Sequence, residues 1–261
     1  MRVLSNGISL HVDEQGKGKG ELSLVFLHYW GGSSRTWKFV ISDLTSTFHT
    51  VAIDHRGWGE SEAPDSGYSL ADMAADAEGI IATLNLRRYV LVGHSMGGKV
   101  AQLMASRRPT GLVGLILVAP SPPSPMALSV EAREMMAKAY DSRATIEGTI
   151  DHVLIAKPLS EEIREQVIED SLKGAPVAKS AWPRATSQED ITEKVGNIHC
   201  PVLVIAGELD KVDKIDVLRS EVMTRLPQAK MHVLPGTGHL SMLESPREVA
   251  TLIQSFCKHI F

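Results

Sequence analysis

Three residue types that together perform nucleophilic catalysis stand far apart in the chain. Ser95 is the centre of Gly-His-Ser-Met-Gly, a G-x-S-x-G spacing that places a serine on a sharp strand-to-helix turn. His239 follows in a second glycine-bearing loop, and a histidine can take the proton that a serine hydroxyl loses when it attacks. Asp210 stands between them, and a carboxylate can hold that histidine in the required tautomer. We therefore predict a catalytic triad of Ser95, Asp210 and His239.

Other carboxylates near Asp210 could also take the place of the acid. Glu208 and Asp213 lie within three residues of it. A second common placement is after the strand-like run that ends at Ala119, but no carboxylate occurs there until Glu131. This absence favours the segment around Asp210, and within that segment we favour Asp210 over Asp213.

A tetrahedral intermediate also needs two N–H donors aimed at its oxyanion. The N–H of Met96, directly after the serine, is in position to be one of them. The other should come from the loop after Leu27, where we favour the N–H of Trp30, with Tyr29 as the alternative. We also expect the side chains of Tyr29 and Trp30 to border the substrate. His28 is expected to tie this loop together by hydrogen bonds rather than to act in catalysis.

The elements that must position these residues alternate between short apolar runs and helical segments. Apolar runs of four to six residues, punctuated by helices, are typical of a parallel sheet buried on both faces. Residues 8–12 alternate between apolar and polar instead, as in an edge strand. The other strand-like runs occupy 22–27, 50–54, 89–93, 115–119, 202–206 and 230–234.

Several predicted helices carry recognisable start signals. Ser69 is a candidate N-cap for a helix over 69–86, with Asp72 in its first turn. The last helix opens at Ser245-Pro246-Arg247-Glu248, which has the spacing of a capping box with proline at the first helical position.

An insert interrupts the strand-and-helix alternation. It begins in the proline-rich segment 120–125, ends near Gly196 and contains no strand-like run. Helical stretches are predicted at about 130–140, 144–155 and 161–172. Four of its residues could line an acyl pocket, but at helical spacing such side chains are more often core residues: Met135, Met136, Tyr140 and Trp182. We therefore predict one α/β domain, residues 1–120 and 197–261, with a helical cap, residues 121–196, inserted into it.

Composition limits the classes of protein that remain. A length of 261 residues corresponds to one or two domains, and a hydrophobic fraction of 43% with a net charge of −4 marks neither a nucleic-acid nor a membrane binder. The first residues do not resemble a signal peptide, no apolar run is long enough to span a bilayer, and two cysteines are too few for a metal cluster. We expect a cytoplasmic protein without metal or cofactor, and a homodimer is left open.

On these residues the chain resembles the α/β-hydrolase superfamily. The resemblance implies the α/β-hydrolase fold, a mostly parallel doubly wound sheet, with a helical cap over the site. Where the family usually has glycine after the loop histidine, this chain has Tyr29. The segments that carry the resemblance are the glycine loop led by His28, residues 54–61, the turn at Ser95, Asp210 and His239.

Single residues favour some activities of this superfamily over others. Haloalkane dehalogenases and epoxide hydrolases use an aspartate as nucleophile, whereas position 95 is a serine. Hydroxynitrile lyases of this fold carry lysine after the catalytic histidine, whereas position 240 is a leucine. We therefore expect a serine hydrolase that cleaves small carboxylic esters through an acyl-enzyme. The alternatives are a carbon–carbon bond (diketone) hydrolase, a perhydrolase, or a triad-bearing ligand receptor with little turnover.

Overall fold

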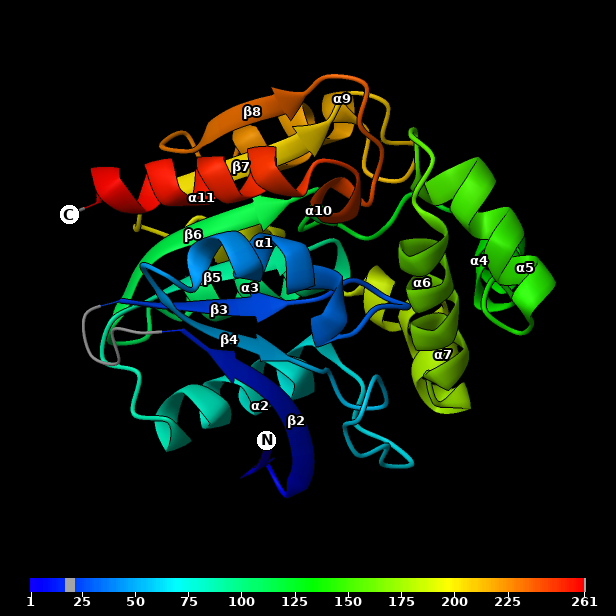
Figure 1. Ribbon diagram of the computed structural model, residues 1–261, viewed down its shortest axis with the longest axis horizontal. Helices are drawn as coiled ribbons and strands as arrows, with labels where there is room; N and C mark the ends of the chain where they lie inside the picture. The colour runs from blue at the N-terminus through cyan, green and yellow to red at the C-terminus, as the bar shows by residue number, and fades with distance from the viewer. Residues whose placement is uncertain (17–21, 261) are drawn as a thin grey trace.

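A computed structural model describes residues 1–16 and 22–260, and an eight-stranded sheet forms its centre (Figure 1). The strands lie in the order β1-β2-β4-β3-β5-β6-β7-β8; β1, β2 and β4 pair antiparallel, and all other neighbours pair parallel. The chain winds outward from β3 in both directions, so the predicted mostly parallel, doubly wound sheet is confirmed. The strands are β1 (Arg2–Ser5), β2 (Ile8–Gln15), β3 (Ser23–Leu27), β4 (His49–Ile53), β5 (Tyr89–His94), β6 (Leu112–Val118), β7 (Val202–Gly207) and β8 (Lys230–Leu234).

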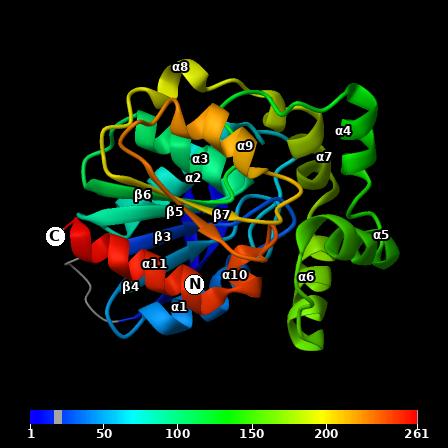
Figure 2. The same cartoon turned by 90° about the horizontal axis from the view of Figure 1, so that it is seen from above.

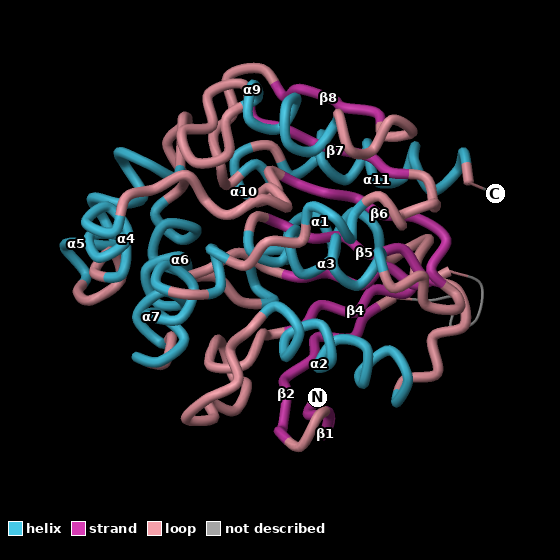
Figure 3. The backbone as a smooth tube through the Cα atoms, turned by 180° about the vertical axis from the view of Figure 1, so that it is seen from behind, coloured by secondary structure: helices cyan, strands magenta, loops and turns pink. Residues whose placement is uncertain are grey.

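Helices cover both faces of this sheet (Figure 2). One face carries α1 (Lys38–Leu44) and α11 (Pro246–His259), and the other carries α2 (Leu70–Thr83) and α3 (Met96–Ser106). Every residue of β3, β4 and β5 is therefore buried, as their mostly apolar sequences predict. Figure 3 shows β1 and β8 at opposite edges of the sheet. The shorter elements are η1 (Ser34–Trp37), α8 (Thr192–Val195), α9 (Ile215–Val217), η4 (Leu218–Met223) and α10 (Ser241–Glu244).

A helical insertion follows β6 and lies beyond the carboxyl ends of the parallel strands (Figures 1 and 2). The helical character of this region agrees with the sequence, but its fourth main helix was not predicted, because Pro183 lies inside it and obscures the pattern. We call α4 to α7 the insertion helices. The elements of this region are α4 (Val130–Ala137), α5 (Arg143–Thr149), η2 (Ile150–Leu154), α6 (Glu161–Lys173), α7 (Pro176–Arg184) and η3 (Thr186–Gln188). Among the described residues, no helix is both long and apolar enough to cross a bilayer.

One of the two helix starts singled out from the sequence has the expected cap. The Ser69 hydroxyl accepts a hydrogen bond from the N–H of Asp72 at 3.1 Å, and the Asp72 carboxylate accepts from the N–H of Ser69 at 3.0 Å. The capping box at Ser245 was wrong, because its side chain makes no cap hydrogen bond. The Ser245 hydroxyl instead accepts from Lys157 Nζ at 3.1 Å and lies 3.2 Å from Thr237 Oγ1.

Candidate active site

Ser95 occupies the turn between β5 and α3, where its backbone is strained. Its φ of 50° and ψ of −115° lie in a region that residues with a Cβ rarely adopt. A Cβ at Gly93 would lie 2.5 Å from the carbonyl O of Gly97, and a Cβ at Gly97 would lie 2.5 Å from that of Leu27. The turn is therefore too tight for any residue but glycine at these two positions. It holds Ser95 at the carboxyl end of the sheet, with 7% of its surface exposed.

His239 and Asp210 form a buried pair at the same end of the sheet. His239 lies in the loop after β8, Asp210 lies in the loop after β7, and His239 Nδ1 is 2.8 Å from Asp210 Oδ2. The N–H of Leu209 donates to the carbonyl O of Thr237 at 2.9 Å, so the two loops are also joined through their backbones. The geometry is that of a histidine whose Nδ1–H is held by a carboxylate, which leaves Nε2 as the basic nitrogen.

Burial and mutual attraction act in opposite directions on the pKa values of this pair. Burial lowers the pKa of His239, but the Asp210 carboxylate, with smaller contributions from Asp213 and Glu244, outweighs burial and raises that pKa above its ordinary value. Burial raises the pKa of Asp210, but His239 and the backbone N–H groups of Val212 and Asp213 lower it further than burial raises it. The pair therefore favours a positive imidazolium beside a negative carboxylate, the state that a general base reaches after it takes a proton.

Asp213, the neighbouring carboxylate weighed against Asp210, lies close to the pair without joining it. Its N–H donates to Asp210 Oδ1 at 3.1 Å, and its own Oδ2 is buried without a hydrogen-bond partner. Burial raises the pKa of Asp213 well above its usual range. Of the two carboxylates, Asp210 is thus the one in contact with His239.

His94 links the Ser95 turn to the loop of His239. His94 Nε2 lies 3.0 Å from the carbonyl O of His239, to which it donates, and the two ring centroids are 4.8 Å apart. Among the described residues, no hydrogen bond joins the Ser95 hydroxyl directly to His239, as is common for catalytic contacts that tighten when substrate binds. The sequence carries no signal for this role of His94 beyond its place beside the serine.

One oxyanion candidate, Met96, is the first residue of α3, so its N–H has no acceptor within the helix. The turn that presents it touches the loop after β3. A Cβ at Gly97 would lie 2.5 Å from the carbonyl O of Leu27 and 2.6 Å from that of His28. The two segments predicted to supply oxyanion donors are therefore in direct contact.

The second candidate, Trp30, has its N–H oriented by His28. His28 Nε2 accepts from the N–H of His55 at 3.0 Å, so the proton of the ring lies on Nδ1, which donates to the carbonyl O of Tyr29 at 2.6 Å. The N–H of Gly32 donates to the same oxygen at 3.1 Å. The N–H of Trp30 belongs to that trans peptide and points the opposite way, without an acceptor among the described residues. The structural role expected of His28 is thus observed.

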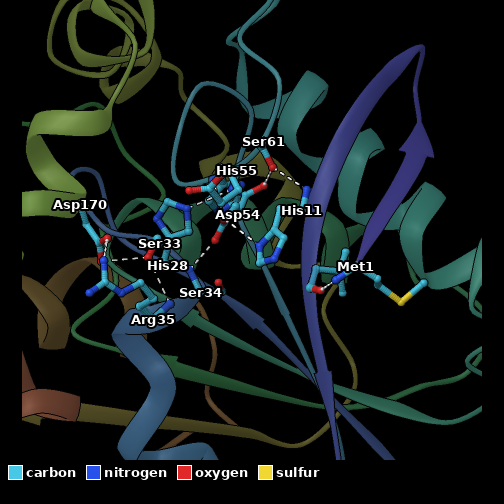
Figure 4. A network of polar contacts seen from close by, with 12 residues as sticks. Met1, His11, His28, Ser33, Ser34, Arg35, Asp54, His55, Ser61 and Asp170 are labelled. Carbon is cyan, nitrogen blue, oxygen red and sulfur yellow. Dashed lines mark hydrogen bonds and ion pairs between the residues drawn. The ribbon is translucent and has the colours of Figure 1, made fainter. Parts of the chain in front are cut away.

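Asp54, directly after β4, holds this loop through a hydrogen bond to its carboxylate (Figure 4). Its Oδ1 accepts from the N–H of Ser34 at 2.6 Å, while its Oδ2 accepts from the N–H of Glu60 at 2.9 Å and lies 3.0 Å from His11 Nδ1. A Cβ at Gly59 would lie 2.1 Å from the same Oδ2, which explains the glycine there. In the sequence, Asp54 belongs to a segment that carries the family resemblance, but no role could be given to it. The structure shows that its carboxylate holds the loop by a hydrogen bond.

The insertion is attached to the same loop through Asp170 of α6 (Figure 4). The hydroxyl of Ser33 donates to Asp170 Oδ2 at 2.9 Å, and Arg35 donates to Oδ1 at 2.9 Å. The carboxyl group is almost fully buried, and burial raises its pKa to about 6 against the opposing effects of Arg35 and Ser33. Nothing in the sequence around Asp170 indicates this contact, because its partners lie more than 130 residues away.

The rings of Tyr29 and Trp30 are both buried beside the site. The Tyr29 ring centroid lies 5.1 Å from that of His94, and the Trp30 centroid lies 4.2 Å from that of Tyr140. Their exposed fractions are 2% and 5%. Whether they border the substrate stays a prediction. Within the part of the chain that the structure describes, no three histidine, cysteine or carboxylate side chains gather as metal ligands would.

Comparison with known proteins identifies the family. The model of the alpha/beta hydrolase family matches residues 24–252, and the chain therefore belongs to this family. It is 28% identical over 267 residues to 2-(acetamidomethylene)succinate hydrolase of Mesorhizobium japonicum, covering 98% of this chain and 94% of that protein. It is 27% identical over 254 residues to a non-heme haloperoxidase of Rhodococcus erythropolis, covering 90% of each.

Solved structures agree on the fold. The esterase EaEST from Exiguobacterium antarcticum superimposes with a TM-score of 0.91 at 21% identity, covering 98% of both chains. At this level of identity the likeness bears on the fold alone. Together with the family match, it defines the chain as a hydrolase of the α/β-hydrolase fold.

Proposed function

We propose that this protein is a serine hydrolase that cleaves small carboxylic esters through an acyl-enzyme on Ser95. The observation that carries the proposal is a strained serine at the β5–α3 turn, joined through His94 to the loop of a His239–Asp210 pair whose contact is 2.8 Å. Strain of this kind persists where the surrounding structure imposes it, and it presents the serine hydroxyl at the helix N-terminus.

In the proposed reaction, the Ser95 hydroxyl attacks the ester carbonyl carbon while His239 Nε2 takes its proton. The carbonyl oxygen becomes an oxyanion that accepts hydrogen bonds from the N–H groups of Met96 and Trp30. His239 then gives its proton to the departing alkoxide, and the alcohol leaves. A water molecule attacks the acyl-enzyme with His239 again as base, which releases the acid and restores Ser95.

We also propose that residues 121–196 act as one cap over this site. Insertion helices lie beyond the carboxyl ends of the strands, and Asp170 of α6 binds the loop that carries Trp30. The buried position of Ser95 is consistent with such a cover.

Turnover of p-nitrophenyl acetate and butyrate tests the proposed function. We expect hydrolysis by the wild type and a rate at least about 10³-fold lower in Ser95→Ala, because no other side chain can form the acyl-enzyme. Ser106→Ala is the matched control, since Ser106 is a buried serine at the other end of α3 whose hydroxyl donates to the carbonyl O of Leu103. A Ser95→Ala rate close to that of the wild type would overturn the proposal.

A wider panel separates this activity from those of related proteins. Thioesters, lactones, peracid formation and diketone acids are assayed beside the esters, each with Ser95→Ala as reference. Faster turnover of diketone acids than of esters would contradict ester cleavage as the main activity. Slow acylation of Ser95 by an ester in a single turnover, without a fast burst of phosphonylation by a fluorophosphonate probe, would indicate a ligand receptor instead.

A further inference from the structure

We infer that Tyr140, on the insertion, is a positioning residue that holds the Trp30 N–H in place for the oxyanion. This inference rests on the proposed function. It assigns a task to a side chain for which the sequence suggests only packing in the core or lining of an acyl pocket. Tyr140 lies between α4 and α5, 110 residues from Trp30 in the chain.

Three hydrogen bonds form a closed circuit between the insertion and the loop after β3. The Tyr140 hydroxyl donates to the carbonyl O of Trp30 at 3.0 Å. The Trp30 indole Nε1 donates to the carbonyl O of Lys179, on α7, at 3.2 Å. Lys179 Nζ donates in turn to the carbonyl O of Tyr140 at 2.9 Å. Each acceptor is a backbone oxygen, so the circuit fixes the course of three chain segments as well as their side chains.

The packing around this circuit leaves little room for another arrangement. The Trp30 and Tyr140 ring centroids lie 4.2 Å apart with the rings tilted by 35°, and Trp58 meets the Tyr140 ring edge-on at 6.4 Å. A Cβ at Gly31 would lie 2.4 Å from the Tyr140 ring. Only 1% of Tyr140 is exposed, and burial raises the pKa of its hydroxyl, so this hydroxyl remains a donor throughout the neutral range.

The circuit bears on catalysis because Trp30 is flanked by two peptide groups. The carbonyl O of the preceding peptide belongs to Tyr29 and is held from the core by His28 Nδ1. The carbonyl O of the following peptide belongs to Trp30 itself and is held from the insertion by Tyr140. The N–H of Trp30 lies in the first of these peptide planes, whose direction His28 sets. Because Tyr140 fixes the second plane, φ and ψ of Trp30 are fixed as well and the first plane cannot rotate that N–H away. His28, beside the sheet, thus supplies one restraint, and Tyr140 of the insertion supplies the other.

Tyr140→Phe tests this inference, because it removes the hydroxyl and retains the ring. For p-nitrophenyl butyrate we expect kcat to fall about tenfold, the effect of one ordinary hydrogen bond, with KM within about twofold. The rate of Ser95 labelling by a fluorophosphonate should fall by the same factor, since that reaction also places an oxygen at the oxyanion site. An unchanged kcat, or a rise in KM alone, would overturn the inference.

Lys173→Gln is the matched control for loosened attachment of the insertion. Lys173 on α6 forms a half-exposed ion pair with Glu60 of the core at 2.6 Å and does not touch Trp30. We expect its kcat to stay within about twofold of the wild type. An equal loss of kcat in Lys173→Gln and Tyr140→Phe would show that general attachment, rather than the Trp30 carbonyl contact, is responsible, and would overturn the inference.

Amide hydrogen exchange tests the same inference without relying on catalysis. Exchange of the peptide that contains residues 28–34 should be faster in Tyr140→Phe than in the wild type and unchanged in Lys173→Gln. Equal exchange in all three proteins would overturn the inference even if esters are hydrolysed. A wild type that neither hydrolyses esters nor reacts with the fluorophosphonate would overturn the proposed function instead, while the exchange result would still decide the role of Tyr140 in the loop.

Discussion

At the scale of single residues, Asp210 controls the proton affinity of His239. His239 must be neutral to take the proton of Ser95, and its pKa is raised above the ordinary value despite burial, through the nearby carboxylate. The rise of kcat/KM with pH, which follows deprotonation of His239, should therefore have its midpoint above pH 6.5 in the wild type. In Asp210→Asn this midpoint should move to lower pH. In addition, kcat should fall about 10³- to 10⁴-fold, because the imidazole loses its required tautomer.

Asp213→Asn serves as the comparison for this pH profile, measured with p-nitrophenyl butyrate from pH 5 to 9. Among the described residues, no hydrogen bond or ion pair joins the Asp213 carboxylate to His239, so we expect the variant to retain at least about a fifth of the activity. A larger loss in Asp213→Asn than in Asp210→Asn would mean that the wrong carboxylate has been assigned.

Residue types and spacing were enough to identify Ser95, His239 and the two oxyanion candidates as residues that meet at one edge of a sheet. They were not enough for His94 or Tyr140, whose contacts are made with backbone carbonyls distant in the chain. A carbonyl acceptor is present at every position, so no residue type marks it in a sequence. Such supports become visible only when the chain is folded.

At the scale of elements, the β5–α3 turn depends on the absence of side chains at its glycines. Gly97→Ala would force a Cβ to within 2.5 Å of the carbonyl O of Leu27, which is backbone and cannot move aside cheaply. We expect the free energy of unfolding to fall by about 1–3 kcal/mol and activity to fall with it, because β3 leads directly into the oxyanion loop. Urea unfolding and ester turnover measure the two effects.

Gly148→Ala in α5 is the control for that substitution. A Cβ at Gly148 meets nothing within 4 Å, so alanine should leave activity unchanged and stabilise the helix by up to about 1 kcal/mol. If Gly97→Ala were as stable and active as Gly148→Ala, the steric account of the turn would be wrong.

Local signals predicted elements well where the local chain decides the structure. The Ser69 cap formed because its partner, Asp72, lies three residues away. The Ser245 cap failed because its hydroxyl contacts Lys157 and Thr237, which belong to other parts of the fold. The prediction of residues 8–12 as an edge strand was wrong, because β2 pairs with β4 on one side and with β1, Arg2–Ser5, on the other. The true edge strand β1 was missed, since four residues give too short a pattern to recognise.

At the scale of the whole molecule, the buried carboxyl of Asp170 makes the attachment of the insertion depend on pH. Burial raises its pKa to about 6, so between its unfolded value and about 6 the folded protein binds one more proton than the unfolded chain. Its contribution to stability is therefore present at low pH and is lost as the pH rises towards about 6. The free energy of unfolding of the wild type, relative to Asp170→Asn, should fall by about 1–3 kcal/mol between pH 4 and 7.

Glu169→Gln distinguishes this effect from a loss of the ion pair with Arg35. Glu169 binds the same arginine at 3.0 Å, but half of its side chain is exposed. Urea unfolding of the wild type and both variants at pH 4 and 7 should give a pH-dependent difference for Asp170→Asn and none for Glu169→Gln. If the difference in unfolding free energy between the wild type and Asp170→Asn were the same at pH 4 and pH 7, the burial argument would be contradicted.

The division into a sheet domain and a helical insertion could be predicted because strand-like runs stop at 119 and resume at 202. The contacts that hold the insertion against the loop after β3 could not be predicted. They pair residues more than 100 positions apart, such as Ser33 with Asp170. Nor does a pattern of apolar residues specify which carboxyl will be buried. The pH dependence of stability predicted for Asp170 follows from those long-range contacts.

Trapping the acyl-enzyme is the most direct test of the central claim. The protein is mixed with excess p-nitrophenyl butyrate, quenched with acid during turnover and analysed by mass spectrometry of its peptides. We predict one butyryl group on the peptide that contains Ser95, and none in Ser95→Ala. Continued turnover with no acylated Ser95 at any quench time, or a butyryl group on another residue whose formation is unaffected by Ser95→Ala, would contradict the account.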